Sequence, residues 1–143
     1  MAIANLQETL LAYTLRKNQL NLDIMEYQSQ KNLAIASVAD TNSLLASGKA
    51  ELRDYFKYLY NNDEELQEAY TDYTEIPEFE EEIDKLTAQI QDELDELSAW
   101  ETQLNAQITT ASAELTEVEA YIQSVTTMLQ SNIQGDFNYG LGQ

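Results

Sequence analysis

The chain of 143 residues carries a formal net charge of −19 and contains neither cysteine nor histidine. These absences exclude disulfides, thiol nucleophiles, the usual zinc sites and imidazole acid–base catalysis. The acidic balance argues against nucleic acid and anionic membrane surfaces as partners, because both are bound through clusters of Lys and Arg. With one proline and four glycines, the chain has too few turn residues for a fold of many short strands, so an all-α fold remains.

Residues 3–60 carry apolar side chains at alternating spacings of three and four, which predicts one long helix with a heptad seam. The weakest helical stretch is TNSLLASG at 41–48, where Ser, Asn and Gly gather and where we expect a kink or hinge. A seam of this length indicates that the helix packs lengthwise against another helix.

A second apolar stripe runs along the same segment and comprises Leu11, Leu15, Leu22, Met25 and Leu33. A helix in a simple two-stranded coil needs only one seam, so a second stripe implies a second partner. That partner is either another segment of the same chain or another copy of the protein. We favour another copy, because the chain offers little further helix to cover this face, and we predict these five residues as an assembly interface.

Residues 61–77 interrupt the heptad pattern and form the predicted connector. Asn62 and Glu65 have the spacing of a capping box, which predicts a short helix over about 63–72. Pro77 stands where a first helical turn begins, and the acidic residues after it suit a helix N-terminus.

The heptad pattern resumes over residues 78–133, and Gly135 is predicted to end this second long helix. The remaining tail, 135–143, is expected to be flexible or to dock on a neighbour. Two helices of matched length joined by a short connector fold back most economically as an antiparallel pair. The fold class is therefore all-α, an elongated antiparallel helical hairpin within a single helical domain, 1–143.

In this hairpin, residue numbers opposite each other are expected to sum to about 137. That register places Lys49, Arg53 and Lys57 opposite the acidic run 80–84, and Trp100 opposite the small residues 34–39. The side chains predicted to form the core between the helices are Leu20, Ile24, Val38, Trp100, Leu104, Ile108, Leu115 and Ile122.

Charge is unevenly distributed between the two helices. Residues 1–60 hold six basic and six acidic groups, whereas residues 61–143 hold one basic group, Lys85, and twenty acidic ones. The acidic half requires a basic, cationic or salt-screened partner wherever it is buried. The first helix is thus expected on the inside of an assembly and the second on the outside.

No pattern of residues points to catalysis, a cofactor or a metal. Acid–base catalysis needs carboxylates in a pocket, whereas those of EFEEEIDK and QDELDELSAWE are expected on a solvated surface. The acidic run also lacks the ligand spacing and central glycine of an EF-hand loop. We therefore predict no catalytic, cofactor-binding or metal-binding residue.

Tyrosines gather around the connector, including Tyr58, Tyr60, Tyr70 and Tyr73. Tyrosine suits contact surfaces, because it offers a large area with a polar tip. Two interpretations stay open with equal weight: these four residues bind a partner protein, or they pack the hairpin turn against its short helix.

The expected function is that of a non-enzymatic, self-assembling structural subunit, with copies of itself as partners. The helical hairpin, the lack of cysteine and the N-terminal MAIANLQETLLAYTLRKN, in which no Sec-type signal is visible, together resemble secreted filament and needle subunits of type III-like systems. The resemblance lies in architecture, and it carries over no functional residue. It implies a filament built through terminal helices, and secretion without a Sec-type signal peptide; otherwise the protein is cytoplasmic.

The alternative function is a soluble coiled-coil adaptor or chaperone-like module that holds a partner protein at the tyrosine-rich end. The stripe of Leu11, Leu15, Leu22 and Met25 discriminates between the two functions. It is buried between copies in the first, and covered within the chain or by a client in the second. No apolar stretch of the sequence approaches the length of a membrane span, so we expect no membrane-spanning helix.

Overall fold

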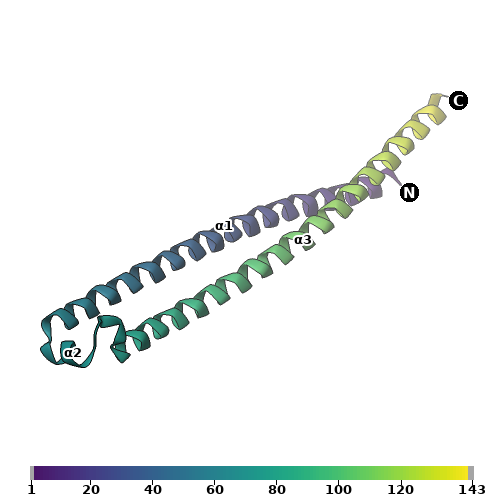
Figure 1. Ribbon diagram of the computed structural model, residues 1–143. Helices are drawn as coiled ribbons and strands as arrows, with labels where there is room; N and C mark the ends of the chain where they lie inside the picture. Colours follow the sequence, from purple (N-terminus) through teal and green to yellow (C-terminus); the bar gives the residue numbers. More distant parts are fainter. Residues whose placement is uncertain (1, 142–143) are drawn as a thin grey trace. The chain divides into compact units, whose positions relative to one another are not determined.

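The computed structural model describes residues 2–141, which form helices and turns and contain no strand. Helix α1 (Ile3–Asn62) is followed by the short α2 (Glu64–Ala69), the 3-10 turn η1 (Tyr73–Glu75) and helix α3 (Pro77–Leu141). Helix α1 packs against α3, and the connector joins them at one end (Figure 1). The predicted all-α helical hairpin with a short connector is confirmed.

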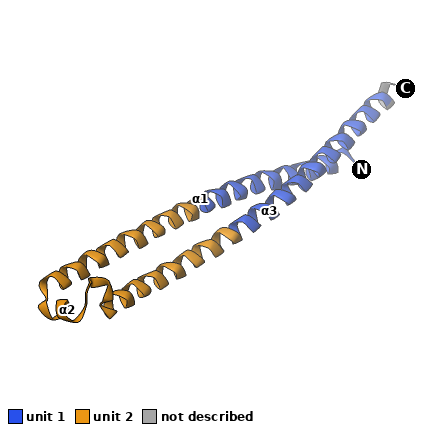
Figure 2. Cartoon of the chain, viewed as in Figure 1, with its two compact units in different colours: residues 1–31, 103–143 blue, residues 32–102 orange. Residues whose placement is uncertain are grey.

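Contacts divide the chain into two compact units, coloured separately in Figure 2. Unit 1 comprises residues 1–31 with 103–143, and unit 2 comprises residues 32–102. The prediction of a single domain concerns how the two units behave together, and it stays a prediction. Each unit contains a pair of helical segments from α1 and α3 with its own buried contacts, and unit 2 also contains the connector.

The core of unit 1 is a heptad seam. Leu20 packs with Ala111 and Val118, and partly buried side chains surround them, namely Tyr13, Ile24, Tyr27, Leu115 and Ile122. Leu6 and Leu104 are also fully buried. Of the side chains predicted for the core, Leu20 and Leu104 are buried, while Ile24, Ile108, Leu115 and Ile122 are half-buried. A helix pair covers only one side of each helix, so half-burial is what these flanking positions can reach.

In unit 2 the same seven-residue period holds small side chains. Ala34 and Thr41 are buried, and Gly48 is half-buried. A Cβ on Gly48 would lie 2.7 Å from Cδ2 of Leu86, so the absence of a side chain is what lets Leu86 approach the α1 backbone. Val38 and Trp100 are half-buried here, as flanking core positions. Trp100 lines a pocket with Ser37 and Thr41, which agrees with its predicted place opposite small residues.

We define the residues of α1 that face α3 at this period as the inner seam: Leu6, Tyr13, Leu20, Tyr27, Ala34, Thr41 and Gly48. Helix α1 continues without interruption through 41–48, so the weak helical sequence there does not break it. Packing against α3 stabilises the helix at 41–48, where the helical propensity of the sequence is low.

The connector differs in detail from the predicted one. Asn62 is the last residue of α1 and donates to the carbonyl of Tyr58, so it does not cap the next helix. Asp63 is the N-cap of α2, since its Oδ1 accepts from the backbone N–H of Glu65 and Leu66. Aspartate is as good a cap as asparagine, and the one-residue shift follows from α1 running two residues further than predicted. Helix α2 ends at Ala69 rather than near 72, because Tyr70 is extended.

Pro77 is the first residue of α3, as predicted, with Glu78 and Glu80 in the first turn. The predicted end of this helix near 133 is wrong, because α3 passes through Gly135 and ends at Leu141. No residue among those described has a positive φ, so Gly135 does not adopt the left-handed conformation of a helix C-cap. A single internal glycine costs about 1 kcal/mol relative to alanine, which a long helix tolerates. Of the predicted tail, 135–141 is helical and 142–143 lies outside the described residues.

The register is close to the predicted one. Tyr13 stacks on Tyr121, and Gly48 faces Leu86, so residue numbers sum to 134 in each unit rather than about 137. The shift is less than one helical turn. None of the ion pairs within residues 2–141 joins Lys49, Arg53 or Lys57 to the acidic run 80–84. Lys85 instead pairs with Glu81 and Glu82 of its own helix.

Replacement of Leu20 by alanine should lower the free energy of unfolding by about 2–5 kcal/mol, because it leaves a cavity in the inner seam. Leu22→Ala is the matched control, because it makes the same truncation two residues away at an exposed position. It should change the free energy of unfolding by about 0.5 kcal/mol or less. Urea unfolding at low protein concentration measures both. Equal losses in the two variants would contradict the assignment of Leu20 to the core.

Candidate assembly surface

The five residues of the second stripe are exposed in the chain. Leu11, Leu15, Leu22, Met25 and Leu33 are 60%, 61%, 60%, 65% and 59% exposed. We call these five residues the outer face of α1. The first four lie in unit 1, and Leu33 lies in unit 2.

The outer face lies on the side of α1 away from α3. Leu22 follows Leu20 by two residues, which places it about 200° further around the helix. Leu20 is 2% exposed, so the two leucines mark opposite sides of one helix. Burying a leucine is worth roughly 1.5–3 kcal/mol, so each uncovered leucine here leaves much of that free energy unrealised.

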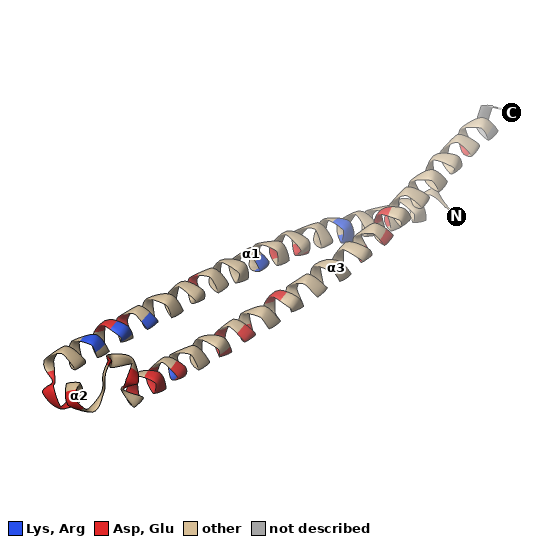
Figure 3. Cartoon of the chain, viewed as in Figure 1, with Lys and Arg blue, Asp and Glu red and all other residues tan. Residues whose placement is uncertain are grey.

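Charge is low where the outer face lies in unit 1. The segment 3–31 of α1 holds three acidic and three basic residues. In unit 2, acidic residues gather over α2 and the first turns of α3 (Figure 3). Residues 32–102 hold nineteen acidic and four basic groups, a net charge of −15. A second negatively charged chain therefore meets less repulsion at the unit 1 segment of α1 than in unit 2.

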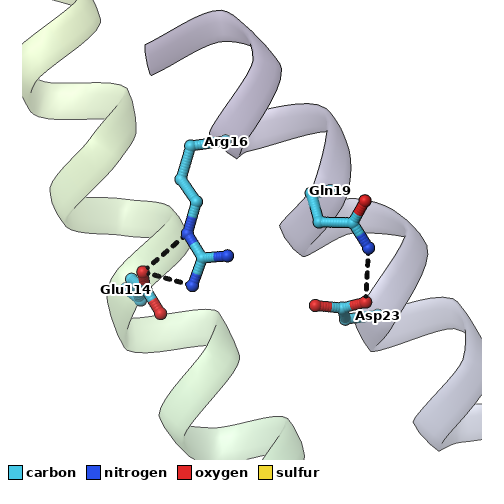
Figure 4. A network of polar contacts seen from close by, with 4 residues as sticks. All are labelled: Arg16, Gln19, Asp23 and Glu114. Atoms are coloured by element: carbon cyan, nitrogen blue, oxygen red, sulfur yellow. Dashed lines mark hydrogen bonds and ion pairs between the residues drawn. The ribbon is translucent and has the colours of Figure 1, made fainter. Parts of the chain in front are cut away.

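A polar network lies beside the inner seam of unit 1 (Figure 4). Both Nε and Nη2 of Arg16 donate to Oε1 of Glu114, at 2.8 and 2.6 Å, and Gln19 donates to Asp23 on the same helix. The side chains of Arg16 and Glu114 are 46% and 41% exposed, so the ion pair contributes at most about 1 kcal/mol. It joins α1 to α3 and leaves the outer face uncharged.

The phenol of Tyr121 interacts with a carboxylate. Its hydroxyl donates to Oε1 of Glu117 at 2.8 Å, and its ring stacks on Tyr13. The hydrogen bond to Glu117 and the negative charge of that carboxylate raise the pKa of Tyr121 above its usual value of 10.0. A phenol held protonated at the surface serves as a hydrogen-bond donor, not as a base or nucleophile.

The tyrosines near the connector mostly hold the connector in place. The hydroxyl of Tyr60 lies 3.1 and 2.9 Å from the carbonyl oxygens of Tyr70 and Thr71. The ring of Tyr73 packs on Phe79, and Nζ of Lys57 lies over that ring. Tyr70 is half-buried. Of the four predicted partner-binding tyrosines, only Tyr58 points outward, at 65% exposed.

Residues 2–141 contain no group of three or more acidic side chains placed to hold a metal ion. Within the same residues, no helix combines the length and the apolar character needed to cross a membrane. Comparison of the chain with protein-family models, curated proteins and solved structures finds no match.

Removal of the Tyr60 hydroxyl in Tyr60→Phe should lower the free energy of unfolding by about 1 kcal/mol, because two connector carbonyls lose their shared donor. Amide hydrogen exchange in residues 70–76 should accelerate with it. Tyr58→Phe is the matched control and should change neither quantity, since that side chain points into solvent. If Tyr60→Phe leaves both the free energy of unfolding and the amide exchange of residues 70–76 unchanged, the role given to this hydroxyl is contradicted.

Proposed function

We propose that the protein is a non-enzymatic, self-assembling structural subunit whose copies pack through the outer face of α1. The product is a filament or another homo-oligomeric assembly. The observation that carries the proposal is the exposure of four large apolar side chains, Leu11, Leu15, Leu22 and Met25, in one row on the back of a helix whose front is already packed.

Scattered apolar residues on a surface need no explanation, but a contiguous row of large ones marks an interaction site. The row follows the heptad spacing of a helix–helix seam, so a helix is the partner that fits it. The copies can supply that helix themselves, since the segment around the row is electrically balanced while the rest of the chain is acidic.

The alternative, an adaptor that holds a client at the tyrosine-rich end, has less support. It uses Tyr58, Tyr60, Tyr70 and Tyr73, and all but the first are half-buried, with Tyr60 bonded to the connector and Tyr73 packed on Phe79. Those contacts leave fewer side chains free for a client, whereas every member of the outer face is free.

The double substitution Leu15→Gln with Leu22→Gln should abolish assembly, because it places two amides in the seam between copies. Sedimentation and negative-stain electron microscopy of wild type and variant at matched high concentration measure this. The control is Tyr58→Gln, an amide substitution at an exposed position of α1 outside the row, which should leave assembly intact. Wild-type protein that stays monomeric at high concentration and moderate salt would overturn the proposal.

Assembly should strengthen as salt is added. Stacked copies bring together chains of net charge −19. Raising ionic strength from about 0.1 M to about 1 M shortens the Debye length from about 10 Å to about 3 Å, which screens that repulsion. Sedimentation across a salt series at fixed protein concentration measures the effect. Dissolution by salt would instead mean that ion pairs between subunits dominate.

A further inference from the structure

Four of the five outer-face residues, all but Leu33, belong to a second heptad seam on α1. In unit 1 its positions follow one another at spacings of four and three and are Leu11, Leu15, Asn18, Leu22, Met25 and Ser29. All six are exposed and none is charged. In unit 2 the same positions hold Asn32, Ala36, Ala39, Ser43 and Ala46, which are likewise exposed and uncharged. A run of this length without charge is unexpected on a protein of net charge −19.

We infer that two copies of the chain pack through residues 11–29 of α1 with their helices parallel and in register, so that Asn18 of one copy meets Asn18 of the other. The inference rests on the proposed function and specifies the geometry of its first contact. It concerns unit 1, where the large apolar residues lie.

A second copy is the occupant that the charges favour. A cationic partner would be drawn to unit 2, where the net charge is −15, and not to a segment with balanced charge. An acidic partner would lack any attraction to this neutral segment. A second α1 brings the same spacing of apolar residues and the same neutrality, so its seam matches this one without ion pairs.

The position of Asn18 favours parallel helices. In an in-register parallel pair each residue faces its own equivalent, so leucine meets leucine and the Asn18 amide donates to the carbonyl of the other Asn18. In an antiparallel pair, residues 11, 18 and 25 face residues 15, 22 and 29. Depending on the register, Asn18 then meets Leu15, Leu22 or Ser29. The register that pairs Asn18 with Ser29 also pairs Leu15 with the polar Asn32. A buried amide without a partner costs about 1–3 kcal/mol.

Repulsion between the acidic parts of the two copies does not forbid the parallel pair. In both units α3 lies across α1 from the outer seam, so two α3 helices are separated by two α1 helices. At about 8–10 Å between neighbouring axes, they are roughly 25–30 Å apart. That distance exceeds the Debye length of about 8 Å at physiological ionic strength.

A two-fold contact between equivalent surfaces closes on itself and gives a pair. Growth of a filament therefore requires a second contact between unlike surfaces. Exposed apolar residues of α3 in unit 1, namely Met128, Ile133 and Phe137, are the side chains available for it. The parallel pair is thus the building block of the assembly and not its final form.

Cysteine cross-linking tests the geometry cleanly, because the chain has no cysteine of its own. Three single variants, Leu11→Cys, Leu22→Cys and Met25→Cys, are oxidised separately and in pairwise mixtures that have been allowed to exchange subunits. A disulfide requires Cβ atoms about 3.5–4.5 Å apart, so it reports which positions face each other. Ser112→Cys, exposed on α3, is the control and should not cross-link.

The parallel pair predicts that each outer-face variant forms a disulfide with itself and that mixtures give no disulfide between different positions. Disulfides between Leu22→Cys and Met25→Cys, without self-links, would overturn the parallel geometry and leave the proposed function standing. A monomeric mass for all variants and for wild type would overturn both.

A second variant tests the role of Asn18. Asn18→Leu should raise the association constant and add mixed disulfides to the self-links, because it removes the polar pair that selects the register. Self-links alone in the Asn18→Leu background would show that another feature selects the geometry, contrary to the inference.

Discussion

The packing of the inner seam of α1 against α3 is the interaction on which the rest of the structure depends. Every seventh residue from Leu6 to Gly48 faces α3, and the side chains become smaller where α3 brings larger ones such as Trp100 and Leu86. A helix pair buries one side of each helix and no more. Because α3 occupies the front of α1, any apolar residue on the back of α1 must find its partner outside the pair.

Charge is also distributed unevenly between the parts of the chain. The connector and the first turns of α3 carry most of the acidic excess (Figure 3). Within unit 1, α3 packs on the side of α1 opposite Leu22. The chain thus combines a large negative charge, which favours solubility, with a neutral row of exposed apolar side chains on α1. We propose that the charge opposes indiscriminate association and that the outer face is where copies of the chain first associate.

The fold could be predicted from the sequence where long periodic patterns govern it. Both long helices, their antiparallel pairing and the start of α3 at Pro77 follow from heptad spacing and from the preference of proline for a first turn. The outer face is exposed in the isolated chain, which agrees with the predicted need for a second partner. Which partner covers the outer face is a proposal.

Prediction failed where neighbouring residues compete for the same role. Asn62 and Asp63 are both good N-caps, and only the length of α1 decides between them. Gly135 can end a helix or lie within one, and α3 continues because an internal glycine costs little in a helix of 65 residues. The pairing of Lys85 with Glu81 and Glu82 of its own helix was not predicted, because a long side chain has several acidic groups within reach. Tyr60 and Tyr73 could not be assigned before their contacts with the connector were known.

The central claim is that another copy covers the outer face of α1, and the oxidation rate of Met25 tests it most directly. Oxidation of methionine by peroxide depends on exposure, and Met25 is 65% exposed in the single chain. Peroxide treatment over a series of protein concentrations, followed by mass spectrometry of the peptide that contains Met25, gives the rate. The account predicts rapid oxidation in dilute solution and strong protection as concentration rises. A rate that stays the same across all concentrations would contradict it.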